Sequence, residues 1–334
     1  MKNNLLQKLL LIVFVSLFSY KVSAVTDLKL SDDHCEGREP AVVYFATHAI
    51  AHPFWTVVEN GAMEGARDAC LTLKWTEDVD FSVQTTIERM EIAVTEKPDV
   101  LVITATDPAA MRDTVERAVA NGVPVIAINV YDPAPPTERL PYMIYVGGDE
   151  YKGGEAAAYR LLKEFDGKPN RALCSNGYPG HVGLELRCKG FADVMEAQGI
   201  PYTLLDTGGG QANAEGALSA YFLKHPDTDI YFANACCPQG WETAKMVLEQ
   251  QGLIGQVKAA TYDLPPIVME SISDGSLIAG IDQSPYSQGY LAAILARQYI
   301  DWGLMPYEQI LTGPAIVDSS NIEKVKAGAA VKRR

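Results

Sequence analysis

The sequence predicts an α/β protein of two similar lobes, each with a mostly parallel sheet covered by helices. From Pro40 onward, short runs rich in β-branched residues alternate with longer amphipathic stretches, which is typical of this architecture. About 310 residues follow a leader segment, which is more than one compact core usually holds. A helix stop that leads into a strand occurs in both halves, at residues 121–122 (Asn-Gly) and 198–201 (Gln-Gly-Ile-Pro).

The elements follow one another in a regular order. Each predicted strand is a short apolar run, and the strands are residues 41–46, 100–104, 123–128, 144–147, 172–175, 230–233, 258–262 and 277–281. Each predicted helix is a longer amphipathic stretch, and the helices are residues 54–70, 83–96, 108–121, 150–165, 184–198, 240–251 and 287–302. Strands that alternate with helices in this way predict parallel pairing within each lobe.

Residues 1–24 have the pattern of a cleaved secretory signal. Lys2 and Lys8 precede an apolar run, and residues 22–24 (Val-Ser-Ala) have the small-x-small pattern that signal peptidase recognises. The alternative is a retained anchor, but the run is shorter than the roughly 20 apolar residues that span a bilayer. The first cysteine, Cys35, lies beyond this point, so no lipid anchor is expected. We therefore expect cleavage after Ala24 and a soluble periplasmic protein.

The charge of the chain excludes some partners. Removing residues 1–24 removes three lysines and no acid, which leaves 25 basic and 42 acidic side chains and a net charge of −17. Such a charge argues against nucleic acid or an anionic membrane as a partner, since both are negatively charged.

Six cysteines in an exported chain permit disulfides. Cys174 at a strand end and Cys188 on the following helix form the expected pair. Cys35 with Cys70 is a second candidate pair. The adjacent residues 236–237 (Cys-Cys) are compatible with two buried thiols or with a vicinal disulfide.

Hydrogen-bonding side chains follow nearly every predicted strand. In open α/β sheets, ligands bind beyond the carboxyl ends of the strands. Turns also favour Asn and Asp, so a single such residue would mean little. The set comes from both lobes and therefore predicts a binding site between them: His48, His52, Thr104, Asp107, Asn129, Asn176, Asn234, Asp263 and Gln283.

Residues 52–55 (His-Pro-Phe-Trp) add aromatic surface at the start of a helix. Pro53 suits the first helical turn, and Phe54 and Trp55 follow it. We expect that the two rings do not both face the same core, so that one of them is available to a ligand. A flat aromatic surface beside polar groups fits the apolar face of a sugar ring or a cyclitol.

Signatures of catalysis are missing from the sequence. It contains no Gly-x-Ser-x-Gly elbow, no phosphate-binding Gly-rich loop that ends in Lys-Ser/Thr, and no dinucleotide fingerprint after the first strand. His48 and His52 flank a loop rather than share a helix face, so they do not form a metal-binding pair. We therefore expect no enzyme activity, no cofactor and no metal, although a hydrolase or lyase stays an alternative.

Seven segments carry a resemblance to a known family. In order, they are HPFWTVVENGAMEGA, PDVLVITATDPAAM, NGVPVIAIN, VGGDEYKGGEAAAYRL, RCKGF, TYDLPPIVMESISDG and AGIDQSPYSQGYLAA. Their order and spacing resemble the ribose-binding-like group of type I periplasmic binding proteins, and in particular the substrate-binding proteins of simple-sugar ABC importers. The match covers nearly the whole chain after the leader.

This resemblance implies two Rossmann-like lobes joined by three crossing segments. We expect the crossings near Gly147, Gln283 and Gly313. The N-terminal lobe then comprises residues 40–148 and 284–312, and the C-terminal lobe comprises residues 149–283 and 313–334.

The resemblance also implies which side chains contact the ligand. Polar contacts are expected from His48 and His52, stacking from Phe54 and Trp55, and bidentate donation to hydroxyls from Arg187 in the segment RCKGF. Further contact positions are Thr104, Asn129, Asn234, Tyr262, Asp263 and Gln283.

Two departures from the family pattern make the predicted site less charged. Residues 129–130 are Asn-Val, where many sugar binders of this group carry Asp-Arg. Residues 234–238 are Asn-Ala-Cys-Cys-Pro, where an Asn-Asp pair is usual. A ligand with fewer hydroxyls than a free sugar is therefore an open alternative.

The resemblance implies a monomer that delivers a small sugar or cyclitol to the membrane permease of an ABC transporter. Two other functions stay open on the sequence. The same fold could carry a lipid-like or other apolar molecule to a different inner-membrane transporter, or it could be a ligand sensor that docks on a kinase or chemoreceptor.

Overall fold

The computed structural model describes residues 34–48, 53–76, 82–235, 240–331 and 333. Residues 38–334 form one compact unit, which contains every helix and strand that the structure describes. The predicted signal at residues 1–24 lies outside the described residues, as do His52, Cys236 and Cys237. Within the described ranges, no helix is both long enough and apolar enough to cross a membrane.

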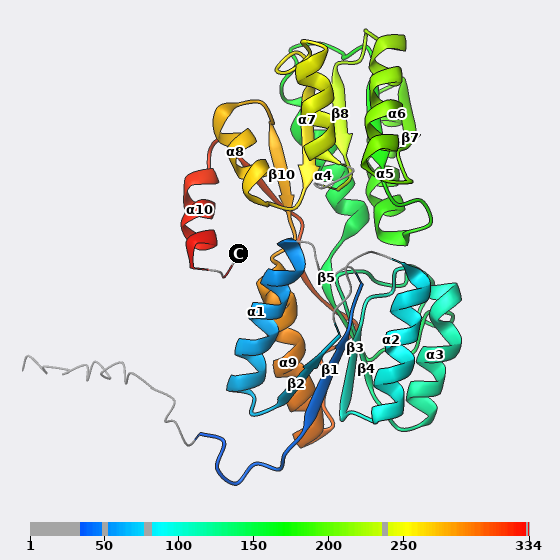
Figure 1. The fold of residues 1–334 in the computed structure, drawn as a ribbon, viewed down its shortest axis with the longest axis vertical. Coiled ribbons are helices and arrows are strands. Elements are labelled where there is room, and N and C mark those ends of the chain that lie inside the picture. The colour runs from blue at the N-terminus through cyan, green and yellow to red at the C-terminus, as the bar shows by residue number, and fades with distance from the viewer. Residues whose placement is uncertain (1–33, 49–52, 77–81, 236–239, 332, 334) are drawn as a thin grey trace, which may run out of the picture. The chain divides into compact units, whose positions relative to one another are not determined.

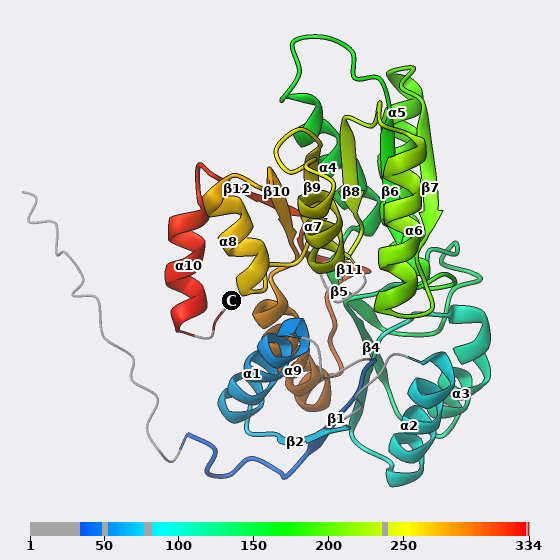
Figure 2. The same cartoon turned by 45° about the horizontal axis from the view of Figure 1, so that its top comes forward.

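Two six-stranded sheets with the same strand order form the centres of two lobes (Figures 1 and 2). The N-lobe sheet has the order β11-β5-β4-β3-β1-β2, with β1 Val42–Ala46, β2 Thr72–Trp75, β3 Val100–Ile103, β4 Val125–Ile128, β5 Ile144–Gly148 and β11 Gln309–Gly313. The C-lobe sheet has the order β12-β10-β9-β8-β6-β7, with β6 Ala172–Asn176, β7 Tyr202–Asp206, β8 Ile230–Ala233, β9 Lys258–Tyr262, β10 Ala279–Asp282 and β12 Ala315–Asp318. All pairings are parallel except that of β10 with β12.

Helices cover both faces of each sheet. In the N-lobe they are α1 Pro53–Asp68, α2 Val83–Glu96, α3 Pro108–Ala120 and α9 Pro285–Trp302. In the C-lobe they are α4 Glu150–Leu162, α5 Val182–Ala197, α6 Gln211–Lys224, α7 Trp241–Gln250, α8 Pro266–Asp274 and α10 Ile322–Ala330. The two mostly parallel sheets with covering helices confirm the predicted fold class.

The central strands are apolar along their whole length because both faces of each sheet are covered. Val43 and Phe45 of β1 pack with α1 and α9, while Tyr44 and Ala46 face α2 and α3. The C-lobe follows the same rule: Cys174 of β6 packs in the cluster that includes α4 and α5, and Leu173 faces α6 and α7. Each lobe therefore has its own two-sided core.

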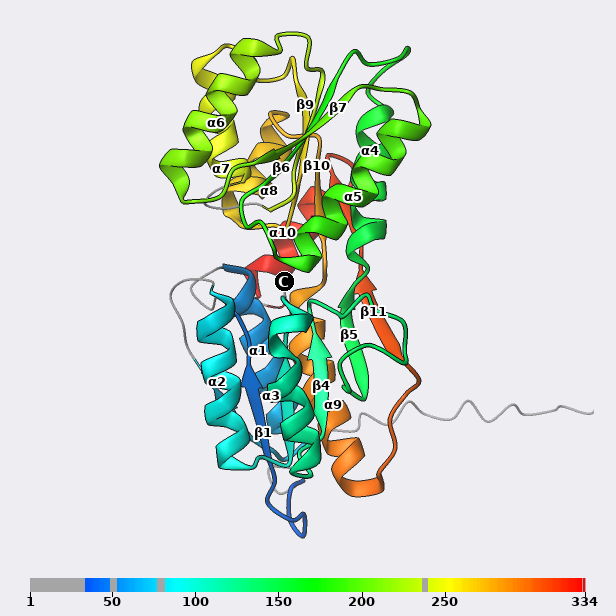
Figure 3. The same cartoon turned by 90° about the vertical axis from the view of Figure 1, so that its right-hand side faces the viewer.

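Three chain segments pass between the lobes, after β5, after β10 and after β11, and Figure 3 shows β5 beside β11 at this junction. Hydrogen bonds join the segments: Asp149 N donates to Gly313 O at 3.1 Å, and the Thr312 hydroxyl donates to Gln283 O at 2.7 Å. The lobe boundaries that we propose, residues 40–148 with 284–312 and residues 149–283 with 313–334, follow these crossings.

Candidate ligand-binding site between the lobes

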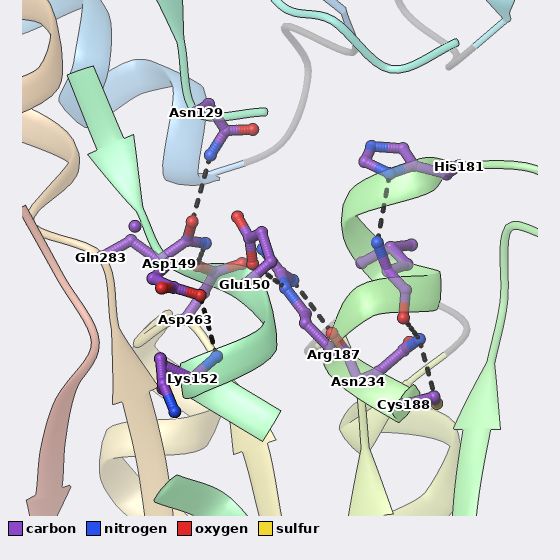
Figure 4. Close-up of polar contacts among 12 residues, drawn as sticks. Asn129, Asp149, Glu150, Lys152, His181, Arg187, Cys188, Asn234, Asp263 and Gln283 are labelled. Carbon is purple, nitrogen blue, oxygen red and sulfur yellow. Dashed lines mark hydrogen bonds and ion pairs between the residues drawn. The ribbon is translucent and has the colours of Figure 1, made fainter. Parts of the chain in front are cut away.

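Three of the predicted site residues form one hydrogen-bonded chain that runs from the N-lobe to the C-lobe. The Asn129 amide donates to Gln283 Oε1 at 3.2 Å, and Gln283 Nε2 donates to Asp263 Oδ1 at 2.7 Å (Figure 4). Asn129 follows β4, Asp263 follows β9 and Gln283 follows β10, so all three stand at carboxyl ends of strands. Asn129 and Asp263 have positive φ angles of 62° and 64°, a conformation that Asn and Asp tolerate better than most residues.

A buried tyrosine supports the N-lobe end of this chain. The Tyr145 hydroxyl lies 2.8 Å from Asn129 O and 2.7 Å from Gly148 O, and it has one proton to donate. Burial raises the pKa of Tyr145 well above its usual value, so the hydroxyl keeps that proton. Tyr145 thereby ties the loop after β4 to the crossing segment after β5.

A buried ion pair forms the C-lobe side of the candidate site. Arg187 on α5 donates from Nε to Glu150 Oε2 at 2.5 Å and from Nη1 to Asn234 O at 3.0 Å. Its guanidinium carbon lies 3.6 Å from the centre of the Tyr262 ring. Burial opposes the charge of Arg187, but the Glu150 carboxylate and Tyr262 outweigh that effect and raise its pKa. The pKa of Glu150 is raised by burial, which Arg187 only partly offsets.

The predicted residues Asn234 and Tyr262 therefore position Arg187, as Figure 4 shows in part. Asn234 also donates to Leu184 O at 3.0 Å, which fixes the first turn of α5. The structure contains the predicted disulfide between Cys174 and Cys188, and it fastens α5 to β6 one residue beyond Arg187. The guanidinium is thus held by its helix, by a covalent bond next to it and by three neighbouring groups.

The N-lobe contributes an aromatic and imidazole cluster. The His48 Nδ1 atom lies 2.9 Å from the Thr104 hydroxyl, and the His48 ring meets the Trp55 ring edge-on with 4.9 Å between centroids. Three predicted residues therefore lie together: His48 after β1, Thr104 after β3 and Trp55 on α1.

One expectation about the aromatic pair is wrong. Phe54 and Trp55 both lie in the apolar cluster between the N-lobe sheet and α9, with their rings 5.1 Å apart and nearly perpendicular. Adjacent helical residues share this core because α1 packs against the sheet and also against α9 beside it, so a broad face of the helix is covered. Trp55 is only 2% exposed, whereas Phe54 lines a hollow at the junction between the lobes.

Two of the polar strand-end residues have local roles. The Asp107 carboxylate caps α3 by accepting from Ala110 N, and Asn176 accepts from Tyr178 N at 3.0 Å in the turn after β6. Both are common functions of Asp and Asn in caps and turns.

Sequence reasoning missed the residue that brings the C-lobe against the N-lobe. His181 is the N-cap of α5, and its ring lies 5.2 Å from the His48 ring. The next residue, Val182, donates its backbone N–H to Thr106 O across the two lobes at 3.1 Å. Burial, with the charge of Arg187, lowers the pKa of His181 to about 3. His181 could have been identified from the sequence because it lies in the loop that follows a predicted strand, β6.

Some of the buried polar atoms without a hydrogen-bond partner lie on or beside the loops of this site. Within the described part of the chain they include the hydroxyls of Thr47 after β1 and Thr106 after β3, and Glu150 Oε1 at the start of α4. A buried polar atom without a partner costs about 1–3 kcal/mol, so native proteins rarely keep one without a use. These atoms add acceptors and donors to the polar groups of the candidate site.

Comparison with known proteins agrees with this geometry. The family described as "Periplasmic binding protein domain" matches residues 43–304. The xylose/arabinose-binding protein XylF of Sulfolobus acidocaldarius is 29% identical over 299 residues, which are 84% of this chain and 72% of that protein. The ribose import binding protein RbsB of Bacillus subtilis is 26% identical over 256 residues, 76% of this chain and 80% of that protein.

Among solved structures, a carbohydrate transporter from Acidothermus cellulolyticus 11B, in complex with myo-inositol, has a TM-score of 0.77 and 29% identity. The match covers 89% of this chain and all of that chain. The matched family is one of binding proteins, which agrees with the prediction that this chain is not an enzyme. With a family match over most of its length and the same two-lobed fold, the chain belongs to the periplasmic binding protein family.

Proposed function

We propose that this protein is the substrate-binding protein of an ABC-type importer and that it captures a small sugar or cyclitol between its two lobes. The observation that carries the proposal is the chain Asn129–Gln283–Asp263, which presents amide and carboxylate groups from both lobes at the ends of their strands. Neighbouring hydroxyls of a polyol pair well with such alternating donors and acceptors. The partner is then the membrane permease, and the protein works as a periplasmic monomer after cleavage at Ala24.

Ligand capture requires contacts from both lobes. A ligand shifts the equilibrium between open and closed forms only by the difference between its affinities for them. The direct contacts of His181 with His48 and of Val182 with Thr106 supply part of the stability of the closed form. Arg187, Glu150 and Asp263 are held in place by partners within the protein, so a ligand whose hydroxyls do not match their remaining hydrogen-bonding atoms, such as Glu150 Oε1, would leave a buried polar atom without a partner.

The ligands named for the relatives support a pentose or a cyclitol. XylF is named for xylose and arabinose, and the Acidothermus protein was solved with myo-inositol. We carry both classes over as candidates. The Asn129-Val130 sequence, which replaces the Asp-Arg of many sugar binders, favours a ligand with fewer charged contacts than those sugars need.

The test is calorimetric titration and thermal unfolding of the purified protein with D-xylose, L-arabinose, D-ribose and myo-inositol. We expect one of these compounds to raise the melting temperature, and Asp263→Ala to weaken its binding at least 10-fold, since a charge-assisted hydrogen bond contributes about 1.5–3 kcal/mol. Glu270→Ala, on the exposed face of α8, is the matched control. The absence of any shift, both with these compounds and with their simple glycosides and ethers, would overturn the proposal.

One observation favours a second class of ligand, a mostly apolar molecule. Val130 is 1% exposed and stands directly after Asn129, so the buried surface next to the polar chain is apolar. A mostly apolar molecule with one or two polar groups would suit it. Native mass spectrometry of protein purified from its own host would distinguish the two classes by the mass of the bound molecule.

A further inference from the structure

A second feature of the junction between the lobes is an apolar hollow of about 200 Å³. Phe54 and Val57 of α1 line it from the N-lobe. From the C-lobe it is lined by Leu264, which precedes α8, and by Met269 within α8. Figure 1 shows α8 and α10 together above α1 on this side of the molecule. Asp263, the last member of the polar chain, also lines the hollow. The polar chain and the apolar hollow are therefore continuous.

The chemistry of the hollow disfavours an anionic guest. Three helices begin at its wall, and each has proline at its start: α1 at Pro53, α8 at Pro266 and α9 at Pro285. Proline has no N–H, so each of these helices lacks one of the donors with which other helix N-termini bind anions. The charged residues that line the hollow are Asp263 and Asp282, and none of its described lining residues is basic.

The carboxylates at this wall already have partners inside the protein. Asp263 accepts from Gln283, and Asp282 accepts from the backbone N–H of Ser284 at 3.0 Å and from its hydroxyl at 3.2 Å. A neutral apolar group can enter the hollow without removing water from an unpaired charge, whereas a sugar acid or sugar phosphate would place like charges together.

We propose that the ligand carries a small apolar substituent, so that it is a neutral glycoside or ether of a sugar or cyclitol rather than the free polyol. This inference rests on the proposed function: the hydroxyls lie at Asn129, Gln283 and Asp263, and the substituent fills the hollow. A cavity of about 150 Å³ accommodates benzene in another protein, so this hollow holds a group the size of butyl or phenyl.

The test compares parent compounds with their derivatives by calorimetry. D-xylose, D-ribose and myo-inositol are each titrated beside their methyl, n-butyl and n-octyl glycosides or ethers. Burial of a methylene group is worth about a fourfold gain in affinity. We expect the affinity to rise by about this factor per carbon from methyl to butyl, and to stop rising at octyl, which exceeds the hollow.

The variant Val57→Phe places a larger ring in the hollow and is expected to reduce the butyl-to-parent affinity ratio at least 10-fold. Met63→Phe makes the same kind of change on the same helix at a side chain that is 48% exposed and does not line the hollow, so it is expected to leave the ratio unchanged. Thermal unfolding of both variants is the control for folding, and we expect a cooperative transition for each.

The outcomes separate this inference from the proposed function. Parents that bind as tightly as their butyl derivatives would overturn the inference and leave the proposed function in place. Derivatives that bind where no parent binds would support the inference. If neither parents nor derivatives bound, both would fall.

Discussion

The Arg187–Glu150 pair determines the electrostatics of the C-lobe side of the candidate site. Both side chains are buried, at 5% and 0% exposure, so their desolvation is costly and their attraction must be supplemented by other bonds. The Asn234 carbonyl and the Tyr262 ring provide that supplement. These contacts fix the guanidinium of Arg187 and keep it charged, as a rigid donor in the proposed site requires.

At the same scale, His181 makes the stability of the protein depend on pH. Its pKa is lowered to about 3 by burial and by Arg187, and the His48 ring faces it from the N-lobe. The unfolded chain takes up a proton near pH 6.5, whereas the folded protein does not. The free energy of unfolding therefore falls as the pH drops below about 6.5, and this loss continues to about pH 3.

Unfolding by urea at a series of pH values checks this prediction. For each pH unit below about 6.5, the protein should lose roughly 1.4 kcal/mol relative to His181→Asn, which keeps an N-cap side chain but no titrating group. Parallel pH profiles for the two proteins would show that His181 does not titrate as we expect.

Single residues also show where the sequence stops being informative. Arg187, Asn234 and Tyr262 were predicted as separate ligand contacts, and the structure joins them into one cluster. Glu150 was predicted only as part of a helix. Its burial depends on the packing of α4 against α5, a non-local contact that no pattern in its own segment records.

At the scale of elements, Gly154 allows that packing. A Cβ atom at Gly154 would lie 1.9 Å from the carbonyl oxygen of Arg187, so α4 and α5 meet backbone to backbone. Glu150 lies one turn before Gly154 on α4, and the close approach places its carboxylate against the guanidinium.

We therefore expect Gly154→Ala to destabilise the protein by about 1–3 kcal/mol, because the two helices must move apart. Gly216→Ala is the matched control, since Gly216 also lies within a helix but has open space around it. There, alanine should stabilise the protein by roughly 0.5–1 kcal/mol through its higher helix propensity. Thermal or urea unfolding measures both, and equal effects of the two substitutions would contradict the packing argument.

Strongly patterned elements were predictable from the sequence. The helix at residues 83–96 and the strands at 230–233 and 258–262 have the bounds that were expected. The short strand β2 and the alternating strand β7 lie at sheet edges, where exposed positions interrupt the apolar run. Strands β2, β11 and β12 were not predicted. The helices α6, α8 and α10 were also missed.

At the scale of the whole molecule, the fold class was predictable because both lobes repeat one pattern of strands and helices, and the family was recognisable from the order of its segments. The contacts between the lobes could not be predicted from the sequence. His181 with His48, and Val182 with Thr106, join residues more than 70 positions apart, and no periodicity reports such a pairing.

The central claim is that a small polyol or its derivative binds to both lobes and holds them closed. Small-angle X-ray scattering of the protein, alone and with a saturating amount of a compound whose binding calorimetry has established, tests it most directly. We expect the radius of gyration to fall when the compound binds. Scattering curves that stay the same at full occupancy would contradict the claim.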